Sequence, residues 1–235
     1  YQPKYDLRDG KVVGLEALLR WHKSEGEIIK PADFIPVAEG SRLIIQIGQW
    51  VLQNVCRQIR SWRDNGFPAV PIAVNLSAYQ LGEQNIVDIV VKAINDAGLA
   101  PKDIELEITE TFLIEDPVII AALHELHKYG VRLSIDDFGT GYSSFKYLKN
   151  YPIYALKIDK SFIDNIGNKS DAAITEAIVS MGHTMNLKTI AEGVETTAQV
   201  EFLRSIKCDI AQGYYLSEPL SGDKITKSAF HPFKF

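Results

Sequence analysis

The sequence has only two cysteines, Cys56 and Cys208, among its 235 residues. Both lie in apolar stretches without the spacing of metal ligands, so the sequence predicts neither a disulfide framework nor a zinc site and favours a reduced, cytoplasmic compartment. Long hydrophobic runs are also missing. The longest apolar stretches, such as LIIQIGQWVLQ, are interrupted by glutamine and fall short of a membrane span. We therefore expect no membrane contact from this segment.

An excess of basic residues is absent as well, because the formal net charge is -5. This balance excludes a broad basic surface for a nucleic acid polymer. Any phosphate-bearing ligand must therefore be bound by groups local to its site. The chain begins at Tyr1 without an initiator methionine. We expect residues 1–235 to form a single domain from a longer multidomain protein, whose other parts can include a membrane anchor.

Strand-like runs alternate with amphipathic helical patterns along the chain, for example the helical spacing of apolar residues over 44–62. This alternation predicts parallel βα units, and about eight strands predict a (β/α)8 barrel, with a doubly wound open sheet as the alternative. The expected strands cover 11–21, 71–76, 103–109, 131–136, 154–159, 187–192 and 208–214, with 1–7 as a candidate eighth.

Polar side chains stand near the C-terminal end of each expected strand. In a parallel barrel these ends converge on one mouth, so the sequence predicts a shared polar site there. The residues concerned are Glu16, Asn75, Glu107, Asp136, Asp137, Lys157, Asp159, Glu192 and Gln212.

Carboxylates gathered in this way repel one another unless cations offset their charge. Oxygen ligands without cysteine or histidine favour Mg²⁺ or Mn²⁺, and Asp136 at a strand end can bridge two ions. Each piece also has an ordinary structural interpretation. Two adjacent aspartates before glycines are typical of a turn, and a glutamate in DIELEIT is typical of a solvated strand face. The joint pattern favours a two-metal site in which Asp136 and Asp137 are ligands.

The same residues resemble the EAL domain family of cyclic di-GMP phosphodiesterases. Glu16-Ala17-Leu18 matches the signature tripeptide of the family, and further matching segments cover nearly the whole chain. They are QP at 2–3, PADFIPVAE, NLS at 75–77, EITET at 107–111, DDFGTGYSS at 136–144, LKID at 156–159, AEGVET at 191–196 and CDIAQGYYLSEPL at 208–220.

The resemblance implies a modified TIM-type barrel whose first strand is antiparallel to the others. It also implies hydrolysis of one phosphodiester bond of cyclic di-GMP to give linear pGpG, which lowers a bacterial second-messenger signal. By position, Glu16, Asn75, Glu107 and Asp136 resemble ligands of one metal ion, and Asp136, Asp137 and Glu192 lie at or near a second.

Other positions resemble further functional residues of the family. Lys157 matches the lysine that holds the attacking water, with Glu16 and Glu192 also in the catalytic set and Glu192 either a ligand or a base. Glu110 resembles the anchor of the loop that starts at Asp136. The positions that resemble substrate contacts are Gln2, Arg20, Asp159, Glu195 and Gln212.

Two alternatives to an enzyme remain open at this level. One is a receptor that binds cyclic di-GMP without cleaving it, and the other is a scaffold or partner-binding domain. A homodimer is expected from the resemblance, as is an upstream sensory or diguanylate cyclase (GGDEF) domain. The apolar helix over 171–185 is a candidate interface, although the spacing of its apolar residues predicts ordinary packing against the barrel, namely Ile174, Ala177, Ile178, Met181 and Met185.

Overall fold

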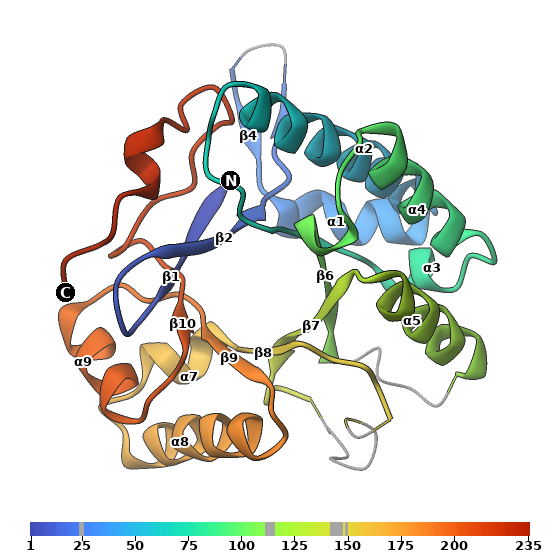
Figure 1. Cartoon of the computed structure of the whole chain (residues 1–235). Coiled ribbons are helices and arrows are strands. Elements are labelled where there is room, and N and C mark those ends of the chain that lie inside the picture. The colour runs from blue at the N-terminus through green and yellow to red at the C-terminus, as the bar shows by residue number, and fades with distance from the viewer. Residues whose placement is uncertain (24–25, 111–115, 142–147, 149) are drawn as a thin grey trace.

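A computed structural model of the whole chain describes residues 1–23, 26–110, 116–141, 148 and 150–235. Strands close into a ring with helices outside it (Figure 1). The order around the ring is β1-β10-β9-β8-β7-β6-β5-β2. The predicted barrel is therefore confirmed, and the alternative of an open, doubly wound sheet is wrong.

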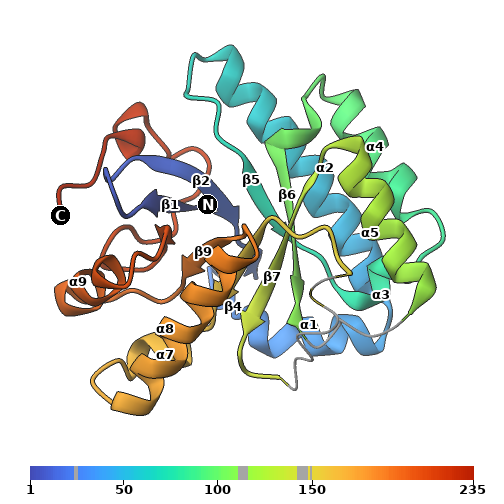
Figure 2. The ribbon, with the colours of Figure 1, turned by 60° about the horizontal axis from the view of Figure 1, so that its bottom comes forward.

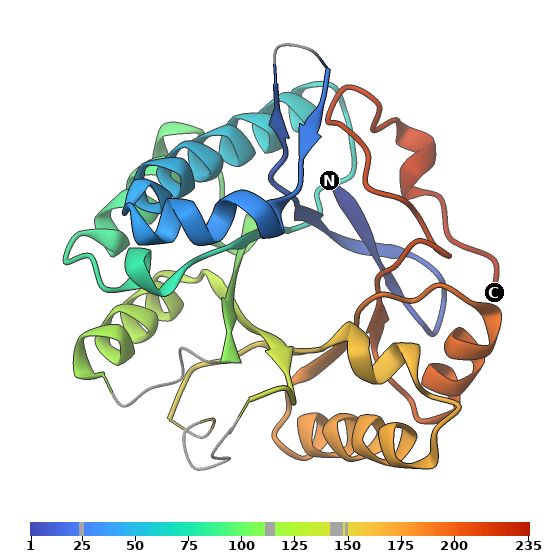
Figure 3. The same ribbon diagram turned by 180° about the vertical axis from the view of Figure 1, so that it is seen from behind.

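Each barrel strand falls within or close to an expected strand. Their bounds are β1 (Gln2–Asp6), β2 (Val12–Ala17), β5 (Ile72–Asn75), β6 (Ile104–Thr109), β7 (Arg132–Phe138), β8 (Ala155–Ile158), β9 (Lys188–Ala191) and β10 (Ile210–Ala211). Two short strands, β3 (Trp21–His22) and β4 (Ile28–Ile29), pair with each other outside the ring (Figure 3).

Helices surround the barrel wall, as the side view shows (Figure 2). Their bounds are α1 (Pro31–Gly40), α2 (Leu43–Asp64), α3 (Ala78–Leu81), α4 (Ile86–Asp96), α5 (Pro117–Tyr129), α7 (Lys160–Asp164), α8 (Lys169–Thr184) and α9 (Thr197–Ser205), with 3-10 turns at Pro101–Asp103 and Lys227–Phe230. None of the helices in the described ranges combines the length and apolar character that crossing a bilayer requires.

Local sequence signals explain where several helices begin and end. Asp116 caps α5 by accepting hydrogen bonds from two backbone N–H groups, Pro117 occupies the first turn, and Gly130 ends the helix at φ 108°. Thr196 and Gln199 form the reciprocal capping box of α9. These short-range signals fix where the chain turns back toward the next strand.

The strand β1 departs from the arrangement expected from the polar pattern, which assumed parallel strands throughout. It pairs antiparallel with both β2 and β10, as the family resemblance implies, while β2 pairs parallel with β5. The turn from Asp6 to Val12, with Gly10 at φ 73°, is too short for the crossover that parallel strands need. The inversion brings the start of β1 to the mouth, where Gln2 pairs with Glu16.

The helix α8 forms where the sequence predicts it, but its buried face differs from the expected one. Ile178 is buried, whereas Ile174 is 38% exposed. Thr175 and Val179 are buried instead, because the helix turns its Thr175–Ile178–Val179–Gly182 side to the barrel. The spacing of apolar residues gave the period correctly and placed the contact face partly wrong.

The C-terminal segment covers the outside of the β1–β2 hairpin, which has no helix of its own (Figure 1). Phe233 packs on Tyr5 with ring centroids 5.9 Å apart and on Tyr215 at 5.6 Å. The backbone of Phe233 also donates a hydrogen bond of 2.8 Å to the carbonyl oxygen of Gly10. A Cβ at Gly10 would lie 2.0 Å from the carbonyl oxygen of Phe233, so this close approach depends on glycine.

We expect Phe233→Ala to lower the free energy of unfolding by about 2 kcal/mol, because a half-buried aromatic ring loses its contacts on the hairpin. Urea unfolding would measure the change. Phe235→Ala is the matched control, since that ring is 41% exposed and should cost clearly less. Equal losses for the two variants would contradict the assigned role of Phe233.

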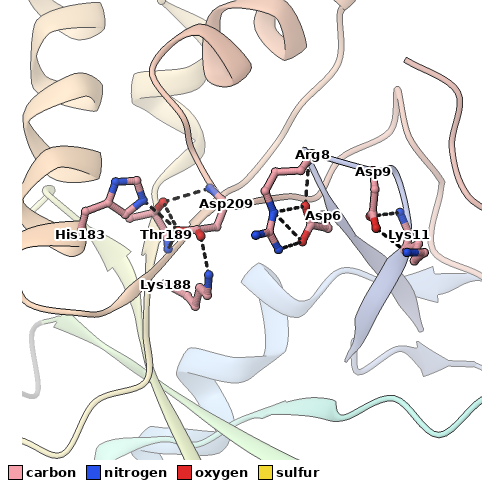
Figure 4. A network of polar contacts seen from close by, with 8 residues as sticks. All are labelled: Asp6, Arg8, Asp9, Lys11, His183, Lys188, Thr189 and Asp209. Atoms are coloured by element: carbon pink, nitrogen blue, oxygen red, sulfur yellow. Dashed lines mark hydrogen bonds and ion pairs between the residues drawn. The ribbon is translucent and has the colours of Figure 1, made fainter.

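A polar network closes the end of the barrel opposite the mouth (Figure 4). Asp209 accepts hydrogen bonds from Lys188 Nζ at 2.6 Å and from both the backbone and the hydroxyl of Thr189 at 3.1 Å, and His183 Nε2 lies 3.1 Å away. Next to it, the Arg8 guanidinium pairs with Asp6. The Asp209 contacts join β9 to the start of β10, whereas the Arg8–Asp6 pair lies at the turn after β1.

Candidate active site

Four carboxylates from four different strands or strand ends surround the buried ammonium of Lys157 on β8. The distances from Lys157 Nζ are 2.5 Å to Glu192, 2.7 Å to Glu107, 3.0 Å to Asp136 and 3.8 Å to Glu16. Lys157 is fully buried, and Glu107 is only 1% exposed. Residues far apart in the sequence thus form one ionic cluster at the mouth.

A bulge in β7 explains how two adjacent aspartates reach this cluster. Side chains normally alternate between the faces of a strand. The pairing of β7 with β8 shifts between Ile135 and Phe138, so Asp136 and Asp137 together stand opposite Lys157. Asp137 adopts a left-handed conformation at φ 54°, and its backbone N–H donates a hydrogen bond of 3.0 Å to Asp136 Oδ1. This local geometry lets both carboxylates point toward the mouth.

Amide side chains hold Glu16 from two sides. Asn75 Nδ2 donates to Glu16 Oε1 at 2.9 Å, and Gln212 Nε2 donates to Glu16 Oε2 at 2.6 Å. Gln212 Nε2 also donates to Gln2 Oε1 at 2.9 Å, and Gln2 in turn donates to the carbonyl oxygen of Ser217. Residues from the first and last strands of the chain therefore help to orient the Glu16 carboxylate.

The cluster separates the pKa values of its carboxyl groups. Burial alone would raise the pKa of Glu107, but the ammonium groups of Lys157 and Lys4 outweigh it and lower that pKa to about 2. Burial raises the pKa of Glu192 to about 8, with Lys157 opposing the shift and Asp136 adding to it. Burial also raises the pKa of Glu16 and of Asp137. The site thus carries carboxylates that burial makes costly to ionise without an added cation.

In chelator, we expect the chain to lose stability as the pH rises from about 4.5 to about 8. A carboxyl whose pKa is raised in the native state keeps its proton there while the unfolded chain releases it, so ionisation penalises the native state increasingly through this window. The loss should be on the order of 5 kcal/mol in urea unfolding. Glu192→Gln should flatten the profile. A profile that is flat in the unmodified chain would contradict the pKa shift of Glu192.

The residues at the mouth fit a divalent cation. Oxygen atoms of Asp136, Asp137 and Glu192 lie within 4.8 Å of one another, which is close enough to share an ion. Gln212 Oε1 is buried without a hydrogen-bond partner among the described residues. The donors are carboxylates and amides, a set that suits hard cations such as Mg²⁺ and Mn²⁺.

The remaining predicted residues lie around this cluster. Glu110 Oε2 accepts hydrogen bonds from the backbone N–H groups of Gly139 at 2.7 Å and Gly141 at 3.3 Å, so it holds the start of the loop after β7. Asp159 caps α7. Glu195 is exposed and pairs with Lys160 at 2.5 Å. The later part of the predicted loop, 142–144, falls outside the described residues.

A cavity of about 290 Å³ opens beside the cluster. It is lined partly by Leu18, Arg20, Asn75 and Thr109, so it reaches from the strand ends to the segment after β2. Arg20 is exposed there and donates one hydrogen bond to the carbonyl oxygen of Leu19. Its guanidinium therefore lies at the exposed rim of this cavity.

Three buried polar residues beneath the site were missed by the sequence interpretation, namely Lys4, Glu105 and Ser134. Lys4 Nζ contacts Glu105 at 3.2 Å and Glu107 at 2.6 Å, and Ser134 Oγ donates to Glu105 at 2.7 Å. The signal was the period of two: Glu105 precedes Glu107 by two residues, so both face the same side of β6. In a closed barrel that side is the lumen.

A closed barrel with its polar side chains gathered at the carboxyl ends of the strands is typical of barrel enzymes, whose active sites lie at that face. Comparison with known proteins specifies the family. The EAL domain profile matches residues 1–219, and the chain therefore belongs to the EAL domain family.

Named relatives agree with this assignment. The chain is 46% identical over 230 residues to the bifunctional diguanylate cyclase/cyclic di-GMP phosphodiesterase MucR of Pseudomonas aeruginosa, covering 97% of this chain and 34% of MucR. It is 45% identical to the cyclic di-GMP phosphodiesterase NbdA of the same organism, covering 94% of this chain and 28% of NbdA. The chain thus spans about a third or less of these relatives.

A solved structure of the PaMucR phosphodiesterase in a c-di-GMP complex superimposes on the chain with a TM-score of 0.91. The two are 46% identical, and the match covers 95% of this chain and 92% of that one. The fold of the described chain is therefore that of an EAL domain.

Proposed function

We propose that this EAL domain hydrolyses one phosphodiester bond of cyclic di-GMP, giving linear pGpG, with Mg²⁺ or Mn²⁺ as cofactor. The observation that carries the proposal is the cluster of Glu16, Glu107, Asp136 and Glu192 around Lys157. It occurs in a chain 46% identical to the PaMucR phosphodiesterase that binds c-di-GMP.

The carboxylates and amide at the strand ends would hold two ions. Glu16, Asn75, Glu107 and Asp136 are assigned to one, and Asp136, Asp137 and Glu192 to the other. The grouping of Asp136, Asp137 and Glu192 oxygens supports Glu192 as a ligand. When bound, such ions neutralise phosphate charge and make water acidic enough to supply a nucleophile near neutral pH.

Lys157 positions the nucleophile in this proposal. Burial opposes the ionised form of the Lys157 amine, but the surrounding carboxylates, Glu107 first among them, outweigh burial and raise its pKa well above the usual value. The group therefore stays an ammonium with three N–H donors. A donor with a fixed proton can orient a water oxygen by hydrogen bonding, and it supports the negative charge that develops on the phosphate.

Residues around the mouth would contact the substrate. Arg20 at the cavity rim offers a guanidinium to a phosphate, which suits bidentate pairing. Polar groups that extend the site are Gln2, Asp159, Glu195 and Gln212. Glu110 would fix the loop after β7 and so keep Asp136 and Asp137 in place.

The setting of the domain is also a proposal. Because the chain covers a third or less of MucR and NbdA, we propose that residues 1–235 form one domain of a longer cytoplasmic signalling protein with an upstream sensory or GGDEF domain. We propose a homodimer as its assembled form. Sedimentation over a dilution series tests that assembly, and a strict monomer would contradict it.

Incubation of the purified chain with cyclic di-GMP and Mn²⁺, followed by chromatography, tests the proposed activity. Linear pGpG should form with Mg²⁺ or Mn²⁺ and should not form in chelator. Binding of cyclic di-GMP without product in either metal would contradict the proposal and favour a receptor.

A further inference from the structure

A second buried lysine contacts the proposed metal site from below. Lys4 lies on the inverted strand β1 and is 3% exposed. Its Nζ is 2.6 Å from Glu107 Oε1 and 3.2 Å from Glu105 Oε1. In the ring order, β2 and β5 separate β1 from β6, so this side chain crosses the lumen rather than reaching a neighbouring strand.

The two lysines hold opposite oxygens of the same carboxylate. Lys157 donates to Glu107 Oε2 at 2.7 Å, and Lys4 donates to Glu107 Oε1. Because both donors are fixed by burial, rotation of the Glu107 carboxylate would break one charge-assisted hydrogen bond. Lys157 also contacts the other carboxylates at the mouth, so Oε2 faces the site and Oε1 faces away from it.

Packing alone does not account for this layer of charge. By strand alternation Ala155 lies on the same side of β8 as Lys157, and there it packs with Ile190 and Ile210 in a buried apolar cluster. A buried ion pair costs desolvation that apolar residues of similar volume avoid, so its presence here calls for another role.

We propose that Lys4 is a positioning residue that fixes the Glu107 carboxylate for divalent metal binding. This inference rests on the proposed function, because it takes Glu107 as a ligand. The competing account is that Lys4 only neutralises Glu105, whose Oε1 accepts hydrogen bonds from both Lys4 and Ser134.

A pair of variants separates the two accounts. Lys4→Met alone leaves Glu105 without its counter-ion, and an unpaired buried charge destabilises the fold. The double variant Lys4→Met/Glu105→Gln removes that unpaired charge and keeps an acceptor for Ser134, while Glu107 still loses its second ammonium. Glu105→Gln alone keeps the Lys4–Glu107 contact. Lys11→Met, on an exposed lysine of the β1–β2 turn, is the surface control.

Mn²⁺ affinity, measured by calorimetry on chelator-treated protein without substrate, is the deciding readout, with thermal unfolding as the check on folding. We expect the double variant to fold like the unmodified chain and to bind Mn²⁺ about tenfold or more weakly, as for other groups that orient metal ligands. Glu105→Gln and Lys11→Met should bind it as the unmodified chain does.

Equal Mn²⁺ affinity in the folded double variant and the unmodified chain would overturn the inference and leave Lys4 as a neutralising partner of Glu105. A tenfold loss in Glu105→Gln would overturn it too, because Lys4 still contacts Glu107 there. The proposed function fails on a different observation, the absence of pGpG from the unmodified chain with metal, so the two failures can be told apart.

Discussion

Asp136→Asn is expected to lower the turnover of cyclic di-GMP about a thousandfold, since a lost ligand removes several kcal/mol of transition-state stabilisation. Asp136 contacts Lys157 at 3.0 Å, and its oxygens lie within 4.8 Å of those of Asp137 and Glu192. Asparagine keeps an oxygen acceptor for the Asp137 N–H but loses the negative charge. The fold should therefore remain while the metal site weakens.

Steady-state kinetics with Mn²⁺ and thermal unfolding check this prediction together. Asp88→Asn is the matched control, because Asp88 lies exposed in the first turn of α4, outside the site. Its turnover should stay within a factor of two of that of the unmodified chain. Hydrolysis by Asp136→Asn at an undiminished rate would contradict the assignment of Asp136 as a ligand.

Lys157→Met is expected to have the largest effect on the stability of the chelated chain. Removing the ammonium leaves four carboxylates facing one another with their main counter-charge gone. Loss of one partner from a buried ion pair costs about 3–5 kcal/mol. The melting temperature in chelator should fall by about 10 °C for a chain of this size.

Mn²⁺ should recover part of this loss, because cations offset the same carboxylates. Hydrolysis should stay undetectable even then, since the donor for the nucleophile is missing. Lys92→Met, which breaks an exposed pair with Asp96, is the control and should shift the melting temperature little. A Lys157→Met chain that is as stable in chelator as the unmodified one would show that the ionic cluster is not held by Lys157.

The sequence predicted the polar residues near the strand ends, because they stand in or beside apolar, strand-like runs. Glu107, Asp136 and Lys157 could be placed at one mouth from the rule that parallel strands converge there. The direction of β1 could not be read from its polar pattern, because alternation with a period of two is the same in either direction. Only the family resemblance pointed to the inversion.

The sequence could not predict which side chains contact one another across the barrel. Glu105 matches the pattern of a solvated strand face, yet ring closure puts it in the lumen beside Lys4. The bulge that brings Asp136 and Asp137 to the same side depends on the register with β8, which no local pattern encodes. For α8, helical spacing gave the period, but the barrel surface decided which of the possible faces became buried.

The most direct test of the central claim is a titration of chelator-treated chain with Mn²⁺ in which heat of binding and pGpG formation are followed on the same preparation. The account predicts no hydrolysis before metal is added, and a rate that rises with occupancy to a plateau at two ions per chain. Cyclic di-GMP hydrolysis that persists in excess chelator, or bound Mn²⁺ without any pGpG, would contradict it.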